Sequence, residues 1–260
     1  MFMRLLQLKL KLDYVQEFKK FYEVTVYPEL QKLPGCIFAG LIKSTPQPDE
    51  FISLTFWDSR LQAEKYEASE VFKTLFGQTK IFLSESSEWK VHLSENMELQ
   101  YDCVETEPVV KKYVVAAKNE DNDEILTLSS NMFVRVLSLI IQEDKVEEFK
   151  KLYTNVVIPA LKITKGCRYV FLTESVNSKN EFISVTIWNK NEDADEYESG
   201  EKYQDLINKM KHTFSQLYLW GLSLENERGA KVKTSDDFKV DHYKMITGKS
   251  FYKIGNKNDR

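Results

Sequence analysis

Two tryptophan–tyrosine pairs are the side chains most suited to handling an aromatic molecule. Trp57 is followed nine residues later by Tyr66, and Trp188 is followed by Tyr197 at the same spacing. Indole rings can line an aromatic pocket, and a phenol can hydrogen-bond or donate a proton to a bound ring. The same residues also serve as packing at a strand-to-helix corner or as core-edge tyrosines with a satisfied hydroxyl. Both interpretations stay open on sequence alone.

Other common chemistry is not indicated. The three histidines do not form a ligand set, and no Ser-His-Asp order, CxxC pair or phosphate-binding glycine loop occurs. We therefore expect no metal site. The three cysteines are odd in number and have no nearby basic partner, which favours reduced thiols and a cytoplasmic protein. The residues concerned are His92, His212, His242, Cys36, Cys103 and Cys167.

Composition restricts the partners. The formal net charge is -4 and the pI is about 5.6, which argues against a nucleic-acid surface. No stretch approaches the roughly 18 apolar residues of a membrane span, and the N-terminus lacks the pattern of a signal peptide. We expect a small-molecule partner, no nucleic acid and no membrane.

The chain repeats itself. Shifted by 131 residues, about 32 of the first 89 positions are identical, and they include Gly35-Cys36 on Gly166-Cys167 and Trp89 on Trp220. Two copies are too few for a solenoid, so a tandem domain duplication is the better interpretation. We predict repeat 1 at 1–117, an acidic linker at 118–130, repeat 2 at 131–250 and a C-terminal tail at 251–260.

Each repeat has the pattern of a small α+β domain. In repeat 1 strands are predicted at 2–11, 36–44, 51–57 and 109–117, with one helix from Asp13 and a second, capped by Ser59 or Asp58, to about Phe82. Pro28 is expected to bend or end the first helix. The order β-α-β-β-α-β is that of the ferredoxin-like fold. Such a sheet leaves one face bare, so two tethered copies are predicted to close into an intramolecular dimeric α/β barrel. The protein would be a monomer with an internal pseudo-dimer, or a homodimer of these.

Three features of each repeat resemble the antibiotic biosynthesis monooxygenase (ABM) family. They are the Gly-Cys opening of the second strand, the end of the third strand (Phe-Trp-Asp-Ser or Ile-Trp-Asn-Lys) and the helix that follows it. That helix has the pattern Ala-x-x-Tyr-Glu-x-x-x-x-Phe/Tyr (Ala63, Tyr66, Phe72; Ala194, Tyr197, Tyr203). The resemblance covers most of both repeats. It implies ferredoxin-like domains paired into dimeric α/β barrels, and activities such as cofactor-free oxidation of aromatic polyketides or oxidative opening of haem.

The haem-degrading branch of the family has an asparagine, a tryptophan and an iron-binding histidine at positions that match Gln7, Tyr66 and Phe76 here. In repeat 2 the matching residues are Ser138, Tyr197 and Ile207. Phenylalanine or isoleucine cannot replace imidazole as an iron ligand, so this departure from the family pattern argues against haem degradation, and we expect no cofactor. Haem held by another ligand, such as His92, is an alternative.

These observations lead to one expected function and one rival. We expect a small aromatic or apolar molecule bound between sheet and helices, oxidised without a cofactor, with Tyr66, Tyr197 and Gln7 as catalytic residues. Ligand-binding residues would be Trp57, Trp188, Ser138 and Phe76. The rival is a non-catalytic module for binding or assembly, with its pockets filled by Phe76 and Ile207. The differences between the copies predict at most one active site.

Overall fold

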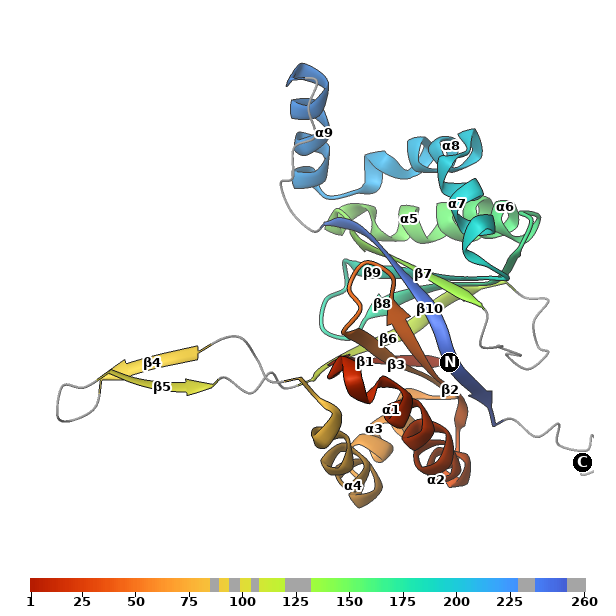
Figure 1. Ribbon diagram of the computed structural model, residues 1–260. Helices are drawn as coiled ribbons and strands as arrows, with labels where there is room; N and C mark the ends of the chain where they lie inside the picture. The colour runs from red at the N-terminus through yellow and green to blue at the C-terminus, as the bar shows by residue number, and fades with distance from the viewer. Residues whose placement is uncertain (85–88, 94–98, 104–107, 120–131, 229–236, 252–260) are drawn as a thin grey trace, which may run out of the picture.

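The protein is built around a closed barrel of eight strands (Figure 1). The computed structural model describes residues 1–84, 89–93, 99–103, 108–119, 132–228 and 237–251. Around the barrel the strand order is β1-β3-β2-β10-β7-β9-β8-β6, and β6 returns to β1. Helices α1–α4 cover one side of the barrel and α5–α8 cover the opposite side (Figure 1).

Repeat 1 follows the predicted β-α-β-β-α-β order. Its strands start and stop within two residues of their predicted limits, because the alternation of apolar side chains marks each strand clearly. Of the two predicted caps of the second helical segment, Ser59 is the one that caps it, by accepting a hydrogen bond from the Gln62 amide at 3.4 Å. The elements are β1 (Phe2–Lys9), α1 (Val15–Phe21), α2 (Tyr27–Lys32), β2 (Cys36–Ser44), β3 (Glu50–Trp57), α3 (Arg60–Glu67), α4 (Glu70–Thr79) and β6 (Val109–Lys118).

Repeat 2 has the same core elements in the same order. They are β7 (Phe133–Ile140), α5 (Val146–Leu152), α6 (Ile158–Lys162), β8 (Cys167–Ser175), β9 (Glu181–Trp188), α7 (Asn191–Ser199), α8 (Glu201–Met210) and β10 (Phe238–Ser250).

The first helix of repeat 1 does not end at Pro28. A π-helical turn over Tyr22–Val26 joins α1 to α2, and Pro28 lies in the first turn of α2, which continues to Lys32. Proline has no amide hydrogen to donate, and the wider turn before it lets the helix continue. Repeat 2 has the same π-helical turn at Tyr153–Val157, before Pro159. The turn also brings the Tyr22 side chain towards the sheet.

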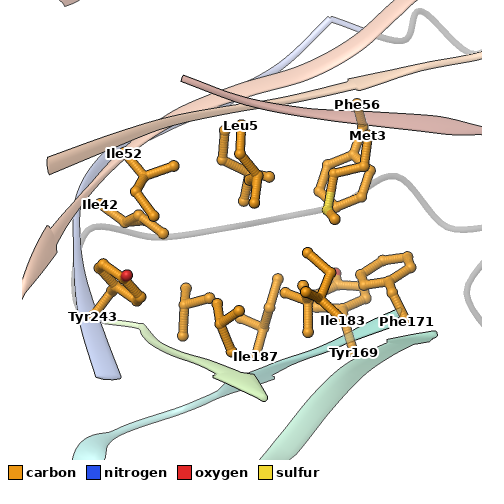
Figure 2. Packing of buried hydrophobic residues seen from close by; sticks show 14 of the residues in the cluster. Met3, Leu5, Ile42, Ile52, Phe56, Tyr169, Phe171, Ile183, Ile187 and Tyr243 are labelled. Carbon is orange, nitrogen blue, oxygen red and sulfur yellow. The ribbon is translucent and has the colours of Figure 1, made fainter. Parts of the chain in front are cut away.

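The last strand of each repeat joins the two halves. β6 pairs with β1 of its own repeat and with β8 of repeat 2, while β10 pairs with β7 and with β2 of repeat 1. Inside the barrel, apolar side chains from both repeats form one buried core (Figure 2). A barrel of eight strands is just wide enough to be filled by side chains. The predicted intramolecular dimeric α/β barrel is therefore confirmed.

The repeats differ after the second helical segment. In repeat 1, β4 (Trp89–Leu93) pairs with β5 (Leu99–Cys103) as a hairpin outside the barrel (Figure 1). In repeat 2 the corresponding stretch is helix α9 (Gln216–Arg228). The matched tryptophans, Trp89 and Trp220, thus lie in a strand and a helix.

Residues 120–131 and 252–260 lie outside the described residues. They contain most of the predicted acidic linker (118–130) and most of the predicted C-terminal tail (251–260). Within the described part of the chain, no helix has both the length and the apolar character needed to span a membrane.

Candidate functional site

The two repeats each bury one arginine between the sheet and the helices. Arg4 on β1 and Arg135 on β7 occupy equivalent positions, and each residue is 2% exposed. In a strand, alternate side chains share a face. Arg4 therefore lies on the same face of β1 as Phe2, Leu6 and Leu8, which pack against the helices. A charge in this apolar layer requires hydrogen-bond partners to compensate for lost hydration.

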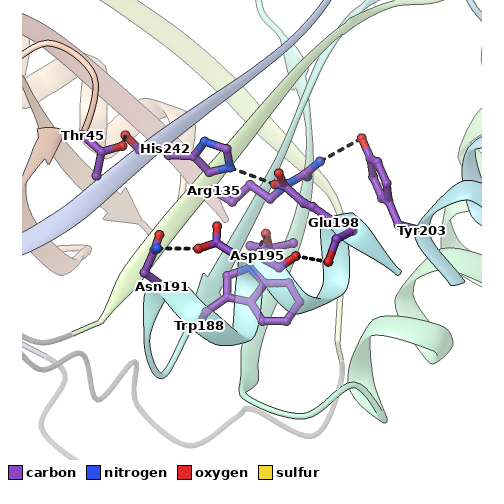
Figure 3. Close-up of polar contacts among 10 residues, drawn as sticks. Thr45, Arg135, Trp188, Asn191, Asp195, Glu198, Tyr203 and His242 are labelled. Atoms are coloured by element: carbon purple, nitrogen blue, oxygen red, sulfur yellow. Dashed lines mark hydrogen bonds and ion pairs between the residues drawn. The ribbon is translucent and has the colours of Figure 1, made fainter. Parts of the chain in front are cut away.

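In repeat 2 these partners are present (Figure 3). The Arg135 Nε group donates to the carboxylate of Glu198 on α7, and its Nη2 donates to the Tyr203 hydroxyl at 3.1 Å. Glu198 also lies 2.8 Å from Nε2 of His242, the residue opposite Arg135 on β10. Burial raises the pKa of Glu198, but the hydrogen bonds and positive charges of His242 and Arg135 outweigh that effect, so its pKa lies below the ordinary value.

In repeat 1 the equivalent network is broken. Glu67, which matches Glu198, forms an ion pair with Lys112 at 2.6 Å. Lys112 lies opposite Arg4 on β6, where repeat 2 has His242. Phe72 replaces Tyr203 and has no hydroxyl to offer.

The Arg4 guanidinium is left without a hydrogen-bonding partner on two nitrogens. Its Nε and Nη2 atoms are buried and unsatisfied within the described structure. The guanidinium carbon lies 4.8 Å from the centre of the Phe72 ring and 5.9 Å from that of Tyr66, which provides cation–π contacts only. Burial lowers the pKa of Arg4, with Tyr66 and Glu67 opposing that shift. An arginine nevertheless stays charged at neutral pH, so repeat 1 contains a buried cation with two unsatisfied nitrogens.

Beside Arg4 there is a cavity of about 40 Å³ between the sheet and the helices. This volume holds a few water-sized groups and is well below that of an open ligand pocket. Phe72 and Phe76 of α4 lie against each other at one side of the cavity, with ring centres 5.8 Å apart, and both are only partly buried. The ring side chains that line the cavity are Phe18, Tyr22, Tyr66, Phe72 and Phe76.

Tyr66 borders the cavity, whereas Trp57 lies behind it. The Trp57 ring stacks on Tyr66 at 5.2 Å, is fully buried, and donates from Nε1 to the Thr55 hydroxyl at 3.0 Å. Burial raises the pKa of Tyr66 to about 12, so its phenol is neutral at physiological pH and can act as a proton donor. Trp57 is placed as packing that fixes the orientation of the Tyr66 ring.

Repeat 2 has the same arrangement of rings. Trp188 lies 5.2 Å from Tyr197 and donates to Thr186 at 2.9 Å. Burial raises the pKa of Tyr197 as well, against the opposing charge of Arg135. Tyr66 and Tyr197 therefore have similar ring contacts and similarly raised pKa values. The main difference is in the hydrogen bonding of the arginine beside each one.

Gln7 and Ser138 do not share a site with the tyrosines. Gln7 lies on the same face of β1 as Met3 and Leu5, which point into the barrel, and it lines a separate cavity of about 170 Å³ with Tyr243. Ser138 holds the equivalent place on β7, beside Lys239 and Ile183 of the neighbouring strands. Gln7 was expected to lie in the same pocket as Tyr66. The two side chains line different cavities, because they lie on opposite faces of the sheet.

The structure offers no metal ligand where the haem-degrading branch has one. Phe76 lines the repeat 1 cavity and Ile207 packs in the repeat 2 core. Among the described residues, no three His, Cys, Asp or Glu side chains gather closely enough to hold a metal ion. The side chain of His92, the alternative haem ligand, lies outside the described residues.

The arginines are the functional candidates that sequence reasoning missed. The sequence does carry a signal, because a charged residue recurs at the same place in both repeats, on the strand face whose other side chains are apolar. A second signal is that Phe72 occupies the position in repeat 1 that Tyr203 occupies in repeat 2, so repeat 1 lacks the hydroxyl that repeat 2 has there. Neither signal shows that Glu67 pairs with Lys112, because that requires the positions of three side chains from different elements.

Comparison with known proteins agrees with this architecture. The model of the antibiotic biosynthesis monooxygenase family matches residues 1–78 and again residues 132–209. The fold is similar to that of a proposed monooxygenase from Fusobacterium nucleatum, with a TM-score of 0.67, 10% identity, and 96% of this chain and 94% of that chain covered. A proposed monooxygenase from Lactobacillus acidophilus gives a TM-score of 0.65 at 8% identity, with 96% of each chain covered.

A third solved structure, an anthrone oxidase-like protein, gives a TM-score of 0.57 at 10% identity, with 97% of this chain and 94% of that chain covered. No curated protein sequence matches the chain. Identities this low establish the fold alone. The family model covers more than half of the chain, in two segments that start at the beginning of each repeat and end within it. The chain therefore belongs to the antibiotic biosynthesis monooxygenase family, with two copies of its domain in tandem.

Proposed function

We propose that repeat 1 binds one small aromatic molecule between its sheet and its helices, and that repeat 2 is the structural counterpart that completes the barrel. The observation that carries this proposal is the cavity beside Tyr66, which is walled by aromatic rings. Stacked and edge-on rings favour an aromatic guest. Phe72 and Phe76 are partly exposed and lie on one short helix, so their rotation would admit a ligand.

Size limits the ligand. The cavity of about 40 Å³ is too small for a fused polycyclic compound unless α4 moves as a whole. Rotation of two phenylalanine side chains makes room for about one ring. A single-ring compound is thus the ligand that this site favours.

The accompanying chemistry would be oxidation by O₂ without a cofactor, in keeping with the family and with neighbours described as monooxygenases. In such a reaction an activated methylene group and O₂ give a carbonyl group and water. One oxygen atom forms the new C=O bond, and the other leaves with the two hydrogens of the methylene, so no external reductant is needed. Tyr66, as a neutral phenol, would donate a proton to the departing oxygen and regain one released from the substrate carbon.

A cavity-filling pair of variants tests the binding proposal. Thr79 lines the repeat 1 cavity, and its equivalent in repeat 2 is the larger Met210. Thr79→Met is expected to abolish binding of single-ring probes such as benzamide and phenol, measured by NMR titration of the full chain. Met210→Thr is the matched control and should leave the probe affinity of repeat 1 unchanged. Probe binding that survives Thr79→Met would contradict the proposal, and a folded wild type that binds no aromatic probe would favour the assembly module.

The proposed role of Tyr66 has its own test. Tyr66→Phe should reduce ligand-dependent oxygen consumption by about 100-fold, the usual contribution of a positioned proton donor. Tyr197→Phe should leave oxygen consumption unchanged, because repeat 2 is assigned no reaction. Equal losses in the two variants would place working sites in both repeats.

A further inference from the structure

We infer that the ligand of repeat 1 carries a carboxylate, and that this carboxylate pairs with the guanidinium of Arg4. The inference rests on the proposed function and adds the chemical class of the ligand. Its basis is the unpaired Arg4 side chain, which is 98% buried and lines the cavity.

Repeat 2 shows what this arginine requires. Arg135 satisfies the edge formed by Nε and Nη2 with two oxygen acceptors, one from Glu198 and one from Tyr203. In Arg4 the same two nitrogens are the unsatisfied ones. Two parallel N–H groups match the two oxygens of a carboxylate, which accepts both hydrogen bonds at once. One ligand group would thus replace both of the acceptors that repeat 1 has lost.

Charge points to the same ligand. Glu67 acts on Arg4 through its charge alone, because its carboxylate pairs with Lys112 at 2.6 Å and accepts no hydrogen bond from Nε or Nη2 of Arg4. Tyr66 and Tyr22 also face the cavity, and burial raises the pKa of both phenols, so neither supplies a negative charge at neutral pH. A neutral ligand would leave the buried Arg4 with a single carboxylate that it shares with Lys112, whereas a ligand carboxylate supplies a second negative charge in a region of low dielectric.

The remaining walls define the rest of the ligand. Phe72 lies directly against the guanidinium, with Phe76 stacked beside it and Tyr66 on the other side. A ring attached to the carboxylate would lie among these side chains once Phe72 and Phe76 rotate. The class that fits both the charge and the rings is a single-ring aryl carboxylate.

Matched probes test the inference on the full chain at neutral pH. Benzoate carries the charge, and benzamide is its neutral counterpart of nearly the same shape. Isothermal titration is expected to give one benzoate site per chain, with at least tenfold tighter binding than benzamide, as for hydrogen bonds to a charged group.

Three variants locate the charge preference. Arg4→Met should remove the preference for benzoate while keeping benzamide binding, and it replaces an unpaired buried charge by an apolar side chain, so folding is preserved. Phe72→Tyr restores the hydroxyl that repeat 2 has at Tyr203, and should weaken benzoate at least tenfold while Arg4 stays in place. Arg135→Met, the control in repeat 2, should leave the preference unchanged.

The outcomes separate this inference from the proposed function. Equal affinities for benzoate and benzamide in the wild type would overturn the carboxylate and leave aromatic binding intact. A benzoate preference that persists in Arg4→Met would also overturn it. If neither probe binds the folded wild type, the proposed function fails, and the inference fails with it.

Discussion

Repeat 1 and repeat 2 bury the same arginine in the same place, yet among the described residues the Nε and Nη2 atoms have hydrogen-bonding partners only in repeat 2. Arg135 contacts a carboxylate and a hydroxyl, whereas the Nε and Nη2 atoms of Arg4 contact neither. Two substitutions account for the difference. Phe72 in place of Tyr203 removes the hydroxyl, and Lys112 in place of His242 provides an ammonium group that engages Glu67. The neighbour on the adjacent strand therefore decides where the carboxylate points.

The proposed division of roles between the repeats rests on this comparison. A buried charge with all its partners is destabilising only when one of them is removed, while an unpaired buried charge lowers stability until an external partner supplies the missing acceptors. Repeat 2 fits the first description and repeat 1 the second. The difference can be tested by removing equivalent atoms from each half.

The largest expected effect comes from removing the carboxylates. Glu198→Ala leaves Arg135 as a buried charge with only a hydroxyl partner, and should lower the free energy of unfolding by about 3–5 kcal/mol. Glu67→Ala removes half of a partly exposed ion pair with Lys112, and should lower it by only about 0–1 kcal/mol. Urea unfolding of both variants and the wild type measures the difference. Similar losses of unfolding free energy in the two variants would show that Glu67 and Glu198 contribute equally to stability, against this prediction.

Removing the arginines should give a smaller and opposite contrast. Arg135→Met breaks hydrogen bonds to a charged partner and should cost about 2 kcal/mol. Arg4→Met removes an unpaired buried cation and should be neutral or stabilising in the absence of ligand. Thermal unfolding of the ligand-free proteins checks this prediction. A clear loss of stability in Arg4→Met would contradict this prediction, because it would mean that Arg4 already has a compensating partner.

A smaller effect is expected in the acid range. Because the pKa of Glu198 is lowered in the folded protein, its contribution to stability is fully present above the ordinary value of about 4.5 and is lost as the pH falls through the folded value. Glu198→Gln keeps the shape but cannot titrate. The stability advantage of the wild type over this variant should therefore shrink as the pH falls below about 4.5, as measured by urea unfolding at a series of pH values. An advantage independent of pH in that range would assign the stabilisation to packing.

Much of the fold could be predicted from the sequence, because its signals are local or repeated. Alternation marked the strands, the offset of 131 residues revealed the duplication, and the bare sheet face predicted the barrel. The continuation of the first helix through Pro28 could not be predicted, since the π-helical turn has no local sequence signal and its first residue, Tyr22, contacts the distant Ser53, with 2.6 Å between the hydroxyls.

The site was predicted only in part. Tyr66 and Phe76 do border one cavity, because both lie on the helical segments that cover the sheet. Gln7 does not, because one step along a strand moves a side chain to the opposite face, and only the alternation with Arg4 and Leu6 shows which face that is. Whether Arg4 has hydrogen-bonding partners depends on contacts among β1, α3, α4 and β6, and the spacing of residues in the sequence does not reveal these contacts.

The exchange of β6 and β10 between the halves has a consequence for how such proteins diversify. In a dimer of identical chains every mutation occurs twice, so a change that unpairs one arginine unpairs both and doubles the loss of stability. Covalent fusion ends that symmetry while the shared strands still hold the halves together. One half is then free to acquire new specificity, and the other maintains the scaffold on which both depend.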